Sequence, residues 1–109
     1  MIFILFLSIT SMAYADSVFD NGVWHQGSTH VHIWKHAPYN AQGKTYDYSI
    51  EFSEPDLGEG GGDGSTDYCS IASENRLVCP FMKITLIYNA GGRSVTLRNG
   101  FSGCTTTYY

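Results

Sequence analysis

The stretch TYDYSIEFS, residues 45–53, decides the fold class of this chain. Its side chains alternate strictly between an aromatic or aliphatic set and a small or charged set. A period of two is typical of a β-strand with one buried face, because successive side chains of a strand point to opposite sides of the sheet. The predicted inner face carries Tyr46, Tyr48, Ile50 and Phe52, and the outer face carries Asp47, Ser49, Glu51 and Ser53.

A second strand is predicted upstream, in THVHIWKH, residues 29–36. Val31 and Ile33 alternate there with imidazoles and an indole, so the aliphatic side chains face inward and the imidazoles face outward. We expect Pro38 to end this strand, since proline has no N–H to donate to a ladder.

The remaining strands are predicted in the C-terminal half. Residues 81–88 form one, and Val95 and Leu97 mark another, reached through a hairpin turn at residues 89–92. Residues 54–66 are Gly-rich and acidic and are predicted to be a loop. No stretch has a helical period, so we predict a mostly-β fold built on a single twisted antiparallel sheet. The alternative is a small all-β sandwich.

Within the predicted strand 81–88, the inner face is expected to carry Met82, Ile84, Leu86 and Tyr88.

Residues 67–79, DYCSIASENRLVC, hold two of the three cysteines and are predicted to form a hairpin. A three-residue loop at 73–75, with Asn75 left-handed, sets a register whose pairs are Ala72–Arg76, Ile71–Leu77 and Cys69–Cys79. The last pair then has Cα atoms about 4.5 Å apart, which permits a disulfide. We therefore favour a Cys69–Cys79 bond with Cys104 unpaired or linking a dimer. Pairing of Cys104 with either of the others remains an alternative.

Residues 1–15 are predicted to be a secretory signal peptide. They have an apolar core over residues 2–7 and a small-x-small end at Ala13-Tyr14-Ala15. This segment is too short to span a bilayer, and we expect no membrane insertion. Residues 16–109 are then one small secreted domain. The formal net charge of −4 argues against a general nucleic-acid surface, which is usually basic, but leaves room for a local basic site.

The histidines raise the question of a metal. His-x-His on a strand, as in His30 and His32, projects two imidazoles to one side and is a common zinc or copper arrangement. His36 lies about 13 Å from His32 along an extended strand, too far to share an ion. Glu51 is a candidate third ligand, but spacing does not fix it in place. A polar strand face is the preferred interpretation, and we expect no metal and no cofactor.

Glu51 and His32 are also a candidate acid–base pair. If strands 29–36 and 44–53 are neighbours, the two side chains lie opposite each other on the outer face. A carboxylate beside an imidazole is equipment for general acid–base catalysis, although an ordinary cross-strand polar pair explains it equally well.

Several short segments follow one another over residues 29–105: His32-Ile33-Trp34, Tyr48-Ser49-Ile50-Glu51-Phe52, a Gly-Gly loop at 61–68, Cys79, and Phe101-Ser102-Gly103-Cys104. Their order resembles the fungal guanyl-specific ribonuclease and ribotoxin superfamily. Its members carry a catalytic His two residues before an aromatic, a catalytic Glu before an aromatic, and a Gly-Gly loop leading into an Asp-Arg-Val strand. They also share a cysteine at the place of Cys79 and a terminal Phe-x-x-Cys. The resemblance implies a ribonuclease-like α+β fold, with the N-terminal helix reduced or absent in this chain.

This chain departs from the family at the groups that carry catalysis. Tyr68 stands where the phosphate-binding Arg belongs, and the family's second His, the general acid, would fall near Ile84. In the family the Glu takes the proton from the ribose 2′-hydroxyl, assisted by the first His. Losing the acid and the fixed cation typically costs factors of about a hundred or more each. The resemblance therefore implies a degenerate site made of His32, Glu51 and Tyr68.

We expect a secreted, catalytically inactive, ribonuclease-like effector that binds an RNA or protein target in a host or neighbouring cell. Two alternatives are a residual ribonuclease using Glu51 and His32, and a metal- or glycan-binding β module. The predicted binding residues are His30, His32, Trp34 and Glu51.

Overall fold

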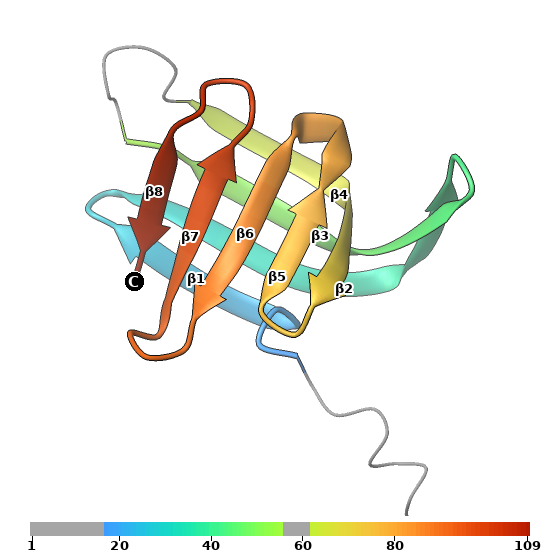
Figure 1. Ribbon diagram of the computed structural model, residues 1–109, viewed down its shortest axis with the longest axis horizontal. Helices are drawn as coiled ribbons and strands as arrows, with labels where there is room; N and C mark the ends of the chain where they lie inside the picture. The colour runs from blue at the N-terminus through green and yellow to red at the C-terminus, as the bar shows by residue number, and fades with distance from the viewer. Residues whose placement is uncertain (1–16, 56–61) are drawn as a thin grey trace, which may run out of the picture.

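The computed structural model describes residues 17–55 and 62–109, and the predicted signal peptide lies outside them. The described residues form eight strands, labelled in Figure 1, and one short 3-10 helix, η1 (Pro80–Met82). Within the described residues no helix is long and apolar enough to cross a membrane. Because the described residues form eight strands and, apart from η1, no helix, the mostly-β prediction is confirmed. The strands are β1 (Asn21–Gln26), β2 (Thr29–Ala41), β3 (Lys44–Ser53), β4 (Asp63–Ser73), β5 (Arg76–Cys79), β6 (Ile84–Asn89), β7 (Ser94–Asn99) and β8 (Thr105–Tyr108).

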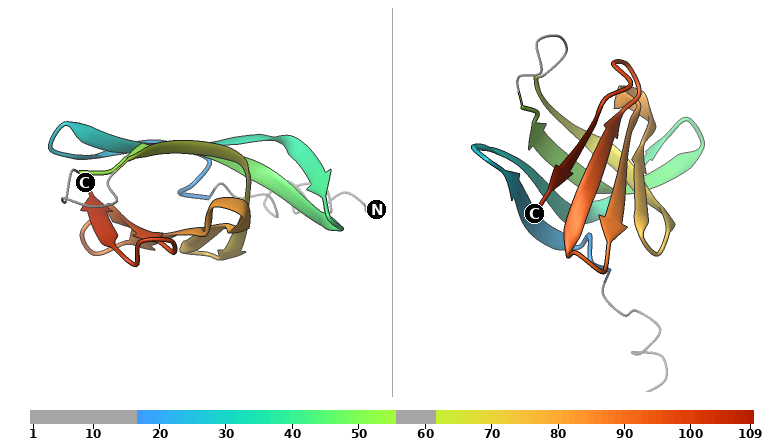
Figure 2. Two further views of the ribbon diagram at one scale, coloured as in Figure 1. Left: turned by 90° about the horizontal axis from the view of Figure 1, so that it is seen from above. Right: turned by 60° about the vertical axis from the view of Figure 1, so that its left-hand side comes forward.

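The eight strands form one antiparallel sheet in which each strand pairs with the next along the chain. Figure 2 shows this sheet curling into a nearly closed barrel, with the end of the β2–β3 hairpin projecting beyond it. The two edges meet at His25 of β1 and Tyr109, which exchange both backbone hydrogen bonds. The prediction of a single antiparallel sheet is thus confirmed.

Inward-facing side chains from all eight strands, together with Phe19, fill the barrel interior. The alternation predicted for residues 45–53 is present in β3: Tyr46, Tyr48, Ile50 and Phe52 are each at most 5% exposed. Tyr108 reaches across the interior, and its hydroxyl donates a hydrogen bond to the backbone carbonyl of Ser53 at 2.7 Å. The core cluster consists of Phe19, Val31, Ile33, Tyr48, Ile50, Phe52, Cys69, Leu77, Cys79, Ile84, Leu86, Val95, Leu97 and Tyr108.

Pro38 does not end β2, so that prediction was wrong. The β2–β3 register shifts between Lys35 and Tyr39, and this irregularity contains the proline where no ladder hydrogen bond is needed. The strand then continues and turns at Gln42 and Gly43, whose φ values of 51° and 80° are both positive. Two positive φ values are typical of the tight hairpin turn that matches strand twist. We call the projecting hairpin, residues 39–46, the arm.

Part of the predicted loop 54–66 is instead strand. β4 begins at Asp63 and pairs with β3, whereas residues 56–61 lie outside the described part. Gly64 allows this pairing because a Cβ there would come within 2.7 Å of the Phe52 ring. The glycine therefore provides space for the Phe52 ring and the end of the Met82 side chain, where the sequence suggested only a loop.

The predicted strand 81–88 begins later than expected. Phe81 and Met82 belong to η1, which starts at Pro80, and Lys83 follows with a left-handed φ of 54°. Proline suits the first position of a helical turn, and the left-handed residue ends it. From Ile84 onward, Ile84 and Leu86 are buried and Tyr88 packs against the core, as predicted.

The β4–β5 hairpin has the predicted pair Ile71–Leu77, but Ser73, not Ala72, is opposite Arg76. An irregularity between Ile71 and Ser73 absorbs the difference, and Asn75 has no positive φ. The loop prediction was wrong in these details. The disulfide prediction is confirmed: Cys69 and Cys79 are bonded with Cα atoms 4.2 Å apart, and Cys104 is free.

We predict that the denatured, non-reduced protein contains one titratable thiol and that Cys104→Ser removes it. Cleaving the Cys69–Cys79 bond, which joins residues separated by 10 positions, should lower the free energy of unfolding by about 2–3 kcal/mol. Thiol titration, peptide mapping and urea unfolding measure these effects. A peptide linking Cys104 to another cysteine of the same molecule would contradict the assigned pairing.

Candidate functional site

The outer surface of β1, β2 and β3 gathers most of the predicted site residues. Directly opposed residues in an antiparallel pair point to the same face. The register pairs Val23 with His32, His25 with His30, and His32 with Glu51. Because Val31 and Ile33 face the core, the residues alternating with them face solvent. We call this surface the imidazole face and define it as Val23, His25, His30, His32, Trp34 and Glu51.

His32 is the centre of the imidazole face. Its Nδ1 lies 3.9 Å from Oε1 of Glu51, and its Nε2 lies 3.4 Å from Oδ1 of Asn21. The first distance is too long for a hydrogen bond, and the His32 and Glu51 side chains are 34% and 56% exposed. The Trp34 ring packs beside His32 with centroids 4.8 Å apart. The predicted juxtaposition of these side chains is present, but on an open, hydrated surface.

A shallow pocket lies beside this centre. It encloses about 300 Å³ between β2, β3 and the start of β4, and its wall includes His30, Glu51 and Asp63. The backbone N–H of His30 donates to Ser53 Oγ at 3.0 Å, which fixes the rim. No basic side chain is among the lining residues that the structure describes, so this recess favours neutral or cationic groups over phosphate.

A resident metal has no ready site here. The His25 and His30 ring centroids are 6.4 Å apart. Within residues 17–55 and 62–109, no group of three or more His, Cys, Asp or Glu side chains is arranged to hold an ion. The expectation of no metal and no cofactor stays a prediction.

Tyr68 is not brought together with His32 and Glu51. Ser65 is the β4 residue opposite Glu51, and Tyr68 lies three residues further along, within the register irregularity between Thr66 and Cys69. Its ring instead packs edge-on against Tyr46 and Phe81, with centroids 5.9 Å and 5.3 Å away. Tyr39 joins this group at 6.1 Å from Tyr68. We call Tyr39, Tyr46, Tyr68 and Phe81 the aromatic cluster; it supports the base of the arm.

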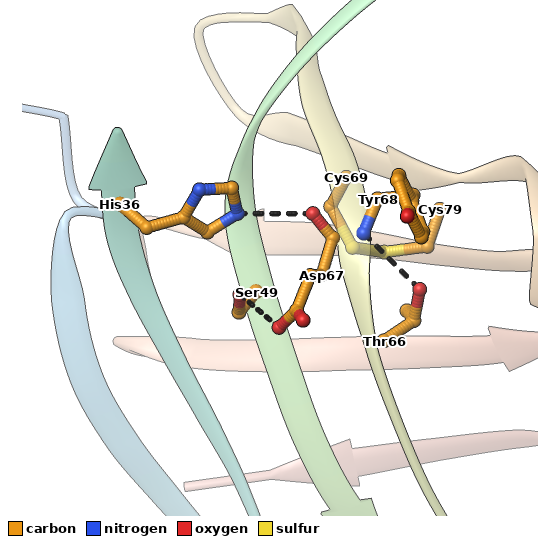
Figure 3. Close-up of a disulfide and its surroundings, with 7 residues drawn as sticks. All are labelled: His36, Ser49, Thr66, Asp67, Tyr68, Cys69 and Cys79. Atoms are coloured by element: carbon orange, nitrogen blue, oxygen red, sulfur yellow. Dashed lines mark hydrogen bonds between the residues drawn. A yellow bond between two sulfur atoms is a disulfide. The ribbon is translucent and has the colours of Figure 1, made fainter. Parts of the chain in front are cut away.

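His36 has a role that its spacing did not suggest. Its Nδ1 lies 2.6 Å from the carbonyl oxygen of Ala37, and its Nε2 lies 2.9 Å from the carbonyl oxygen of Asp67 (Figure 3). A carbonyl oxygen only accepts, so both bonds form together only when the imidazole carries two protons. Protonated His36 thus ties the irregular part of β2 to β4, immediately before the arm.

The environment of His36 favours its charged form. Desolvation lowers its pKa, but hydrogen bonds to the carbonyls of Ala37, Asp67 and Tyr48 and the charge of Asp67 outweigh it, so the pKa is raised above 6.5. The Asp67 carboxylate is held in place by the hydroxyl of Ser49, which donates to it at 2.7 Å (Figure 3).

His25 is the one member of the imidazole face besides Val23 that the sequence interpretation did not include. The alternation of Val23 and His25 before the Gly27-Ser28 turn is the signal that could have found it. The stretch is short and polar, and its pairing with β2 depends on a turn that composition alone predicts weakly.

No protein-family model, no curated protein and no solved structure matches this chain.

We predict that His36 makes stability depend on pH. A folded-state pKa above 6.5 means that its contribution is present below about pH 6.5 and is lost as pH rises through the folded-state pKa. His36→Gln should flatten this part of the stability profile, whereas Lys35→Gln, a charge-removing control on the same strand, should preserve it. Urea unfolding across the pH range measures both; identical profiles for wild type and His36→Gln would contradict the assignment.

Proposed function

We propose that this chain is a secreted, non-catalytic binding protein that engages a protein target in a host or neighbouring cell through its imidazole face. The observation that carries the proposal is the open cross-strand cluster in which Trp34 packs on His32 beside Glu51. On this proposal, the binding protein resembles a guanyl-specific ribonuclease whose catalytic site has degenerated.

The composition of the imidazole face suits protein recognition. Val23 is 49% exposed and lies opposite His32, so it adds apolar area next to the Trp34 indole. Large aromatic side chains with neighbouring polar groups provide much of the binding energy in protein interfaces. The strands beneath are held by the barrel core, which keeps these side chains in place before binding and lowers the entropic cost of association.

RNA is the less favoured target because the face has no permanent cation. Phosphate contacts by Lys and Arg provide most of the nonspecific affinity for nucleic acids. None of the chain's six Lys and Arg residues belongs to the imidazole face, whereas Glu51 does. Its three imidazoles are the face's only source of positive charge.

Residual ribonuclease activity is a second candidate, supported by one observation. His32 and Glu51 are 3.9 Å apart, close enough for a bound 2′-hydroxyl to contact both. Against it, Tyr68 is remote from the pair, and within the described residues the pocket beside Glu51 holds no Lys or Arg to bind phosphate. A glycan is a third target class that Trp34 can stack against.

We predict that the purified protein does not cleave guanine-containing single-stranded RNA faster than its Glu51→Gln variant. Without a general acid and a fixed cation, the pair lacks groups worth about a hundredfold or more each. Gel analysis of end-labelled RNA measures cleavage. Wild-type cleavage that disappears in Glu51→Gln and in His32→Ala would establish the enzyme and refute the non-catalytic proposal.

We predict that a photo-crosslinking residue at position 23 captures a discrete protein from an extract of target cells. The same residue at position 85, on the outer face of β6, should not capture it. Trp34→Ala should reduce the position-23 adduct about tenfold or more, since truncating an interface hot spot costs roughly 2 kcal/mol or more. Equal adducts from both positions, or adducts insensitive to Trp34→Ala, would contradict the proposed surface.

A further inference from the structure

The barrel is closed at its seam by a single residue pair. The N–H of His25 donates to the carbonyl of Tyr109 at 2.7 Å, and the N–H of Tyr109 donates to the carbonyl of His25 at 2.6 Å. Two residues that exchange both bonds are a hydrogen-bonded pair of an antiparallel ladder. Continuing this ladder would place Gly27 opposite Thr107 and Thr29 opposite Thr105. It does not continue, because Gly27, with a φ of +61°, reverses the chain into β2.

The outer edge of β8 is consequently open. Backbone groups alternate in direction along a strand, so the N–H and C=O of Thr107 and Thr105 point the same way as those of Tyr109, toward the seam. The groups of Tyr108 and Thr106 point toward β7 instead. Among the described residues, no backbone partner is recorded for Thr105 or Thr107 on the seam side. Within residues 17–55 and 62–109, two N–H and two C=O groups thus have no neighbouring strand.

A groove occupies the place that a continued β1 would fill. It has a volume of about 660 Å³ and lies between the β1–β2 turn, Pro55 and the edge of β8. The lining residues that belong to the described parts of the chain include no charged side chain and no aromatic ring. The lining residues are Gln26, Gly27, Ser28, Thr29, Pro55, Thr105, Thr106 and Thr107.

We propose that this groove binds an extended peptide segment of a partner protein, which adds to the sheet antiparallel to β8. The exposed ladder groups are spaced for another strand, and an unpaired strand edge is a ready template for one. The described lining residues carry no charge to attract an ionic ligand, whereas main-chain hydrogen bonds to Thr105 and Thr107 need no particular partner charge. Ser28 and Thr29 line the same space; the Thr29 hydroxyl already donates to the carbonyl of Gln26 at 2.6 Å, so toward an incoming segment it can act only as an acceptor.

This site is separate from the imidazole face, so the proposal does not depend on the protein-binding function proposed for that face. The groove is bounded by the turn that follows His25, whereas Trp34 and Glu51 lie further along the neighbouring strands.

Hydrogen exchange of the free protein, read by NMR, tests the open edge without any variant. We expect the amides of Thr105 and Thr107 to exchange at least tenfold faster than those of Thr106 and Tyr108. Slow exchange of all four amides in a monomer would overturn the proposal, because the edge would already be paired. Slow exchange that appears only with concentration-dependent dimerisation would also overturn it, since a second copy would then be the occupant.

Binding is tested with linear octapeptides selected on the wild-type protein from a phage-displayed library. The bound peptide should slow exchange at Thr105 and Thr107, and Thr107→Pro, which removes one seam-facing N–H, should weaken binding at least tenfold. Trp34→Ala, on the imidazole face, should leave this affinity unchanged. Failure to select any peptide, or peptides that leave the two amides unprotected, would refute the groove; loss of binding in Trp34→Ala alone would assign the peptides to the other surface.

Discussion

Burial of one side of a single long sheet is the constraint on which the rest of this structure depends. A chain of this size buries only a modest fraction of its surface, and here the single sheet provides both walls of its own core. Each strand turns its apolar side chains inward, and curling brings β1 and β8 within hydrogen-bonding distance. Tyr108 shows the result directly: it comes from the last strand and reaches the backbone of β3 across the interior. The outer surface is then left to polar and aromatic side chains, including the whole imidazole face.

The predictable part of the fold follows from local alternation. In β3 and β6 the inward residues could be assigned from period alone, and the opposed cysteines of β4 and β5 followed from counting outward from a turn. β1 and β8 could not be found in this way. NGVWHQ and TTTY are short and largely polar, and what makes them strands is pairing with neighbours that only the closed sheet supplies. Pro38 and Gly64 both gave wrong predictions because their places depend on tertiary pairing. Pro38 lies where the ladder is irregular, and Gly64 leaves room for the Phe52 ring.

The candidate site likewise has one part that the sequence predicts and one part that it does not. His30, His32, Trp34 and Glu51 share a surface because the β2–β3 hairpin sets their register, and a hairpin is a local feature that a sequence can indicate. Tyr68 was expected beside them and is elsewhere, because the β3–β4 register shifts between Ser65 and Cys69 and carries Tyr68 into the aromatic cluster. That displacement has a structural benefit. A two-stranded ribbon is marginally stable by itself, and the arm is supported at its base by the aromatic cluster and by the two carbonyls that His36 contacts.

The two proposed binding surfaces meet at one short element, the β1–β2 hairpin. Its outer face carries His25 and His30, while its turn, with Gln26 and Thr29, forms one wall of the seam groove. The free edge of β1 is tied to the rest of the barrel through His25 and Tyr109, and its start is tied through the carbonyl of Asp20, which accepts from the N–H of Lys35. An added strand at β8 would contact this turn. A partner that occupied both surfaces would therefore contact two sides of the same hairpin, whose position is already fixed by its pairing with the barrel.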